Sequence, residues 1–194
     1  MKKLLAWITL TVFALSLAGA VAESNDAMMD TLSAMEWSFY SGVGAWSTDF
    51  RILPDGSFSG EYHDSEMGEA EEDYPEGTVY FRAFTGRLSL TGERDEYSWT
   101  VRIDELLPEE TEEQEWIDGG IRFVLSETYG LSQGDEMVLY APGTPVDVLP
   151  EEMIFWTHVM DRENPPAELE NWFLMSEANA SGFVGEQVPE TPLT

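Results

Sequence analysis

The sequence predicts a mainly β protein: an antiparallel meander that forms a barrel or a strongly curved sheet, with one short helix. Bulky apolar residues alternate with polar residues between about residue 37 and residue 104, as half-buried strands require. Turn-forming pairs such as Asp-Gly divide this region into short strands. Hydrophobic residues make up 43% of the chain and aromatic residues 12%, too much apolar content for a disordered acidic chain. We therefore expect a fold with an aromatic core.

The first half of the chain contains four predicted strands in succession. Residues 46–52 alternate strictly, and Pro54-Asp55-Gly56 then supplies the tight reversal of a hairpin. The returning strand places three residues on its inner face: Phe58, Gly60 and Tyr62. Two more strands are expected over 78–90, with a bend at Gly86, and over 97–104.

The second half is less regular. Residues 121–125 and 137–140 have the composition of strands. Proline followed by two acids at residue 150 favours the start of a short helix that ends near residue 160. Because its apolar residues cover most of one side, this helix should lie against or across the opening of the sheet. Residues 172–175 and 182–184 predict a last hairpin.

Residues 1–22 have the pattern of a secretory signal peptide. Two lysines precede an uncharged, mostly apolar run, and Ala20-Val21-Ala22 is a small-x-small cleavage tripeptide. We therefore expect a protein that is secreted or lies on the exterior of the cell envelope, with no stable membrane anchor after cleavage. The remaining chain is expected to form a single β-rich domain, residues 23–186, followed by a flexible tail, residues 187–194.

The chain is strongly acidic. It has 38 acids against 9 Lys and Arg, a net charge of −29, and loss of the leader's two lysines lowers this to −31. Such a charge repels nucleic acids and anionic lipid surfaces. The absence of cysteine excludes disulfides and thiolate metal sites. Two stretches without arginine, residues 61–76 and 104–118, concentrate the acids and are expected to be solvent-exposed loops.

The first of these stretches contains a candidate calcium site. In His63-Asp64-Ser65-Glu66-Met67-Gly68, Asp64 and Glu66 fit the first two ligand positions of an EF-hand loop, and carboxylate oxygens are the ligands that Ca²⁺ prefers. However, Glu69 stands where that loop requires a turn glycine. A solvated loop without a metal is the alternative. No other cofactor is predicted.

Candidate ligand-binding residues are Trp46, His63 and Trp99. Indole rings stack on sugar rings, although Trp46 and Trp99 also lie in the apolar phase of their strands and could belong to the core. If Trp116 is exposed beside the acidic stretch, it could form a cation–π contact with a basic ligand. No residue is assigned a catalytic role, because no Gly-x-Ser-x-Gly elbow occurs and 38 acids produce carboxylate pairs by chance.

Several motifs resemble an uncharacterised family of exported proteins and lipoproteins of anaerobic Gram-positive bacteria. They include Gly42-Val43-Gly44-Ala45-Trp46-Ser47-Thr48, Tyr74-Pro75-Glu76-Gly77 and Pro142-Gly143-Thr144-Pro145. Ala20 stands where the lipoprotein members carry the acylated cysteine. The resemblance implies export and no particular activity. Gly44-Ala45-Trp46 is also similar to the Gly-x-Trp that begins the lipocalin barrel, which implies an interior filled by aromatic residues or holding one small apolar ligand.

These observations favour an exported, non-enzymatic β-domain that binds an unknown small molecule or protein. Two alternatives remain open: a calcium-stabilised extracellular structural module, and an extracellular hydrolase that uses carboxylates. The state of the barrel interior decides where a ligand could bind. An apolar cavity favours an interior ligand, whereas a packed core favours binding to a partner at the surface.

Overall fold

The computed structural model describes residues 25–42, 44–109, 113–157 and 166–188. Eight antiparallel strands close into a barrel, which confirms the predicted fold class. Consecutive strands pair with one another, and the last strand pairs with the first, so the barrel is a simple meander. In ring order the strands are β1 (Met35–Tyr40), β2 (Trp46–Ile52), β3 (Ser57–Glu66), β4 (Thr78–Glu93), β5 (Ser98–Pro108), β8 (Glu136–Tyr140), β9 (Trp172–Ser176) and β10 (Ser181–Gln187).

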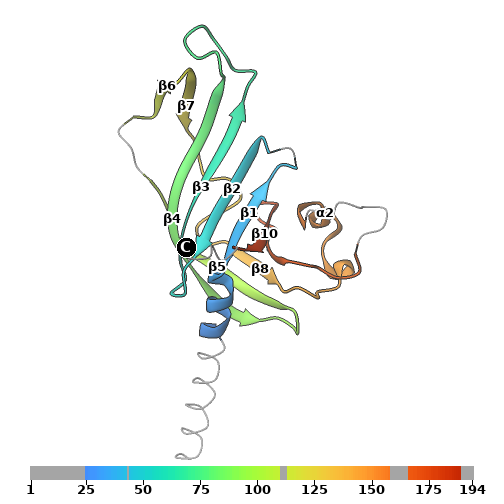
Figure 1. Cartoon of the computed structure of the whole chain (residues 1–194). Helices are drawn as coiled ribbons and strands as arrows, with labels where there is room; N and C mark the ends of the chain where they lie inside the picture. Colours follow the sequence, from blue (N-terminus) through green and yellow to red (C-terminus); the bar gives the residue numbers. More distant parts are fainter. Residues whose placement is uncertain (1–24, 43, 110–112, 158–165, 189–194) are drawn as a thin grey trace, which may run out of the picture.

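A hairpin inserted between β5 and β8 enlarges one side of the sheet. Its strands are β6 (Glu115–Asp118) and β7 (Ile121–Leu125), and β7 pairs in parallel with the first residues of β4. Figure 1 shows β3 and β4 running past the other strands of the barrel, with β6 and β7 beside their far ends. We call these four paired strands, β3, β4, β7 and β6, the extension.

The barrel interior is filled by side chains. Phe58 lies opposite Gly86 and Phe50 lies opposite Gly60, and in each pair the aromatic group lies against the strand where the glycine has no side chain. Cross-strand pairs of this kind let large rings fill a narrow barrel. The buried aromatic residues of this core are Trp37, Phe39, Phe50, Phe58, Phe84 and Phe183.

Both ends of the barrel are closed by other segments. A helix over residues 25–33, drawn in blue at the end away from the extension, inserts Met29 and Leu32 into the core. At the opposite end the chain after β7 crosses the barrel, where the Thr48 hydroxyl donates to the Tyr129 carbonyl oxygen at 2.7 Å and Leu131 is buried. The sequence pattern does not predict the helix over 25–33.

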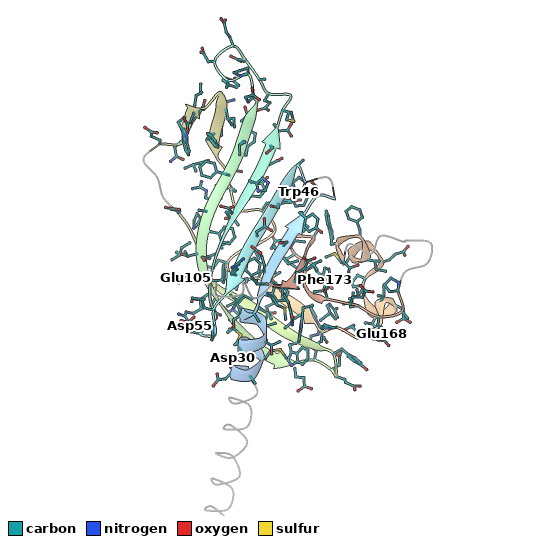
Figure 2. The ribbon with its side chains drawn as sticks, viewed as in Figure 1. Asp30, Trp46, Asp55, Glu105, Glu168 and Phe173 are labelled. Atoms are coloured by element: carbon teal, nitrogen blue, oxygen red, sulfur yellow. The ribbon has the colours of Figure 1, made fainter. Side chains whose placement is uncertain are left out.

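Short helices cover the outer face of β8, β9 and β10. They are η1 (Val146–Val148), α2 (Glu151–Ile154) and η2 (Phe155–Thr157), and they confirm the predicted helix near residue 150, whose expected last residues, 158–160, lie outside the described residues. A second buried cluster lies between these helices and the sheet, and Phe173 points into it (Figure 2). The other buried members are Val138, Tyr140, Val146, Leu149, Met153, Leu169, Met175 and Val184.

The two acidic stretches are not simply loops, so that expectation was wrong. Strand β3 continues to Glu66, β5 continues to Pro108, and β6 begins at Glu115. Acids are tolerated there because the outward side of a strand faces solvent, as Glu61 and Glu105 do. At the other end of the chain, β10 includes Gln187 and Val188 donates its backbone N–H to the Ala34 carbonyl, so these two residues of the predicted tail are ordered; residues 189–194 lie outside the described residues. The predicted leader lies outside the described residues.

No helix among the described residues combines the length and the apolar composition that a membrane span requires.

Candidate functional site

Trp46 lies in an aromatic cluster at the extension end of the barrel (Figure 2). Its ring contacts Phe39 edge-to-face at 4.8 Å and Tyr129 at 5.2 Å, measured between ring centroids. Tyr129 also contacts Tyr62 at 5.9 Å and remains 46% exposed. Trp46 is therefore mainly a packing residue that closes the barrel, with Tyr129 as the accessible member of the cluster.

Burial and the neighbouring Asp64 carboxylate raise the pKa of Tyr62 to about 12. The protonated hydroxyl is thus favoured by the fold, and this contribution to stability is complete below the unfolded pKa of about 10 and is lost as pH rises through about 12. We predict that Tyr62→Phe makes the loss of stability between pH 10 and pH 12 shallower, measured by urea unfolding across that range. Equal slopes in Tyr62→Phe and wild type would contradict the prediction.

Trp99 lies far from Trp46 along the barrel. It stands near the start of β5, opposite Leu139, and its ring contacts Trp172 at 6.0 Å. Both tryptophans pack against the main core from opposite ends, so they do not form one binding site.

Asp64 and Glu66 lie on the inward side of β3, two residues apart, rather than in a loop. Asp64 is opposite Trp46 and Tyr80, and Glu66 is opposite Thr78. Within the described residues, no group of three or more His, Asp or Glu side chains is placed to hold a metal ion. Calcium binding at these two carboxylates stays a prediction.

His63 points to the outside of the barrel, opposite in direction to Asp64, because the strand continues through it. On this outer face, His63 is the last member of a series of hydrogen-bonded side chains. The Ser38 hydroxyl donates to one Asp49 oxygen at 2.5 Å, the Ser47 hydroxyl donates to the other, and the Ser47 oxygen lies 3.2 Å from His63 Nδ1. The three strands β1, β2 and β3 each contribute to this series.

The direction of these bonds does not suit hydrolysis. A hydroxyl has one proton, and Ser47 gives it to Asp49, so His63 Nδ1 must be the donor in its contact with Ser47. A histidine in that role does not remove the serine proton, as nucleophilic catalysis would require. Asp49 accepts one hydrogen bond on each of its carboxylate oxygens.

The outer face of the extension carries a third aromatic cluster. Trp116 of β6 and Phe123 of β7 stack with their centroids 5.4 Å apart, and Phe81 of β4 meets the Trp116 ring edge-to-face at 5.2 Å. Alternation and strand register put these residues on the same side as His63. All three are partly exposed and belong to neither buried cluster. We call them the outer aromatic cluster.

A groove of about 730 Å³ lies on the same outer face, over β1 to β5. Gly60 is in its floor, and Ala83, two residues along β4 from Phe81, is in its lining, so the groove reaches the neighbourhood of the outer aromatic cluster. Leu107 forms an apolar edge that is 51% exposed. The charged residues that line the groove are Glu36, Asp49, Arg51, Glu61 and Glu109.

The sequence pattern identified only part of this surface. It singled out His63 and Trp116, which do lie on the outer face. It did not connect them with Phe81 and Phe123, because the three aromatic residues come from strands whose pairing is set by tertiary structure. The parallel pairing of β7 with β4 leaves no local signal in the sequence.

Comparison of the chain with models of protein families, with curated proteins and with solved structures finds no match in any of the three.

Proposed function

We propose that the protein is an exported, non-enzymatic binding domain whose ligand or partner binds to the outer face of the sheet. The resemblance to lipocalins implied that the interior could hold a ligand, but buried rings occupy that space. Binding is therefore assigned to the surface, and the serine–histidine contact, with its unsuitable direction, does not support a hydrolase.

One observation carries the proposal: the outer aromatic cluster remains partly exposed on a sheet face where no described element packs over it. The rings of the outer aromatic cluster do not contribute to either buried cluster, so the core is complete without them. Large amphipathic rings are typical of binding surfaces because they supply much contact area with little loss of side-chain entropy. The adjoining groove extends this surface across the barrel.

The test is a thermal-shift comparison of wild type with Trp116→Ala, using hexa-arginine, cellohexaose and palmitate as probes. A bound ligand stabilises the native state, by about 2.7 kcal/mol at a concentration 100 times the Kd. We predict that hexa-arginine or cellohexaose raises the Tm of wild type and that this shift is largely lost in Trp116→Ala. The substitution itself should cost only about 1 kcal/mol, because Trp116 lies outside both buried clusters.

Tyr97→Ala is the matched control, since Tyr97 is an exposed aromatic residue beside the start of β5, away from the extension. It should keep the ligand-induced shift. The proposal fails if the shift survives in Trp116→Ala, or if palmitate alone stabilises the protein equally in all variants, which would indicate an interior site.

A further inference from the structure

We infer that the outer face binds a basic polypeptide segment, with an arginine side chain seated between Glu61 and Glu109. This inference rests on the proposed function and adds the chemical class of the partner.

Two carboxylates stand on either side of a small residue. Glu61 on β3 is directly opposite Ala83 on β4, and the Glu109 backbone N–H donates to the Ala83 carbonyl from the other side at 2.8 Å. Both acids are exposed and both line the groove. Ala83, which has only a methyl group, lies between the two acids in the lining of the groove. The groove, at about 730 Å³, has room for an arginine side chain.

The groove contains no free positive charge of its own. Arg51, the one cationic residue among the described residues that line it, donates to the Glu36 carboxylate at 3.1 Å. Asp49 accepts hydrogen bonds from the Ser38 and Ser47 hydroxyls, one on each carboxylate oxygen. Among the described residues, the carboxylates of Glu61 and Glu109 have no ion-pair or hydrogen-bond partner. An incoming cation is therefore the complement of this groove.

The same side of β4 continues from Ala83 to Phe81 and the outer aromatic cluster. Arginine combines an apolar stem, a planar guanidinium that can bond two carboxylates, and a weakly hydrated face that stacks on aromatic rings. Leu107, 51% exposed, gives the stem an apolar contact at the groove edge. A second basic residue would lie over the rings of Trp116 and Phe123.

The dimensions and the total charge favour a polypeptide. Four neighbouring strands, β3 to β6 through β4 and β7, span about 14 Å at the usual strand spacing. An extended peptide covers that distance with about four or five residues. Nucleic acid, an anionic membrane and a second copy of this chain all carry charge of the same sign as its net −29 and are repelled.

The experiment titrates full-length protein with acetylated, amidated hexa-arginine and compares two double variants. Glu61→Gln with Glu109→Gln removes the two groove carboxylates, and Glu72→Gln with Asp73→Asn removes the same charge from the exposed β3–β4 connection. The groove variant should bind about 10-fold more weakly, because exposed ion pairs contribute up to about 1 kcal/mol each. The control should change Kd by less than about 2-fold.

Spectral mapping separates this inference from the proposed function. Hexa-arginine should shift the indole N–H signal of Trp116, assigned with Trp116→Phe. Equal weakening in both double variants, or equal binding of spermine, would overturn the assignment of a seated polypeptide. If cellohexaose shifts that indole signal and hexa-arginine does not, the partner class is wrong and the proposed function stands. If neither probe shifts it, both are wrong.

Discussion

Gly86→Ala is expected to lower the free energy of unfolding by about 3 kcal/mol or more. Gly86 lies on the inner face of β4, opposite Phe58. A Cβ atom there would stand 2.3 Å from the Phe58 ring and 2.3 Å from the Glu105 carbonyl oxygen. The ring cannot retreat, because Phe50 and Phe84 contact it at 5.5 and 6.2 Å between centroids. For a chain of this size the Tm should fall by about 10 °C.

Gly92→Ala, in the same strand, is the matched control. A Cβ atom at Gly92 has no neighbour within 4 Å, so the variant should stay within about 0.5 kcal/mol of wild type. Urea unfolding monitored by circular dichroism measures both. If Gly86→Ala were as mild as Gly92→Ala, the interior would be loosely packed, and an interior ligand site would again become reasonable.

The structural elements that could be predicted from sequence are those with a local signal. The β2–β3 hairpin was predicted because strict alternation meets Asp55-Gly56, and Gly56 has the positive φ of 80° that a tight reversal requires. The inward positions of Phe58 and Tyr62 follow from the same alternation. Four consecutive strands then imply a meander, whereas closure of the ring depends on the pairing of β1 with β10, which lie far apart in the sequence.

The elements that were missed depend on contacts between distant parts of the chain. The acidic residues 104–108 suggested a loop by composition, but the pairing of Leu106 and Leu107 with β4 keeps them in a strand. Trp46 and Trp99 were candidates for ligand binding or for the core, and the structure packs them against opposite ends of the core. The outer aromatic cluster exists only because β7 pairs with β4, which no window of the sequence indicates.

The helix over residues 25–33 leads to a second large effect. Leu32 is 1% exposed, and the Trp37 indole N–H lies 3.4 Å from the Leu32 carbonyl oxygen that accepts it, so the helix is attached to the core by packing and by a hydrogen bond. Truncating a buried leucine leaves a cavity that the surrounding residues fill only in part. We therefore expect Leu32→Ala to lower the free energy of unfolding by about 3 kcal/mol.

Asp30→Ala is the matched control on the same helix, because Asp30 is exposed and points to solvent (Figure 2). It should change the free energy of unfolding by less than about 0.5 kcal/mol. Chemical unfolding of both variants decides whether the helix is part of the domain. The predicted domain starts at residue 23, only a few residues before this helix, so a large effect at Leu32 means that the helix over residues 25–33 closes the barrel. Equal, small effects would instead place the start of the folded domain at β1, and the end of the barrel beside Trp37 would then be open to solvent.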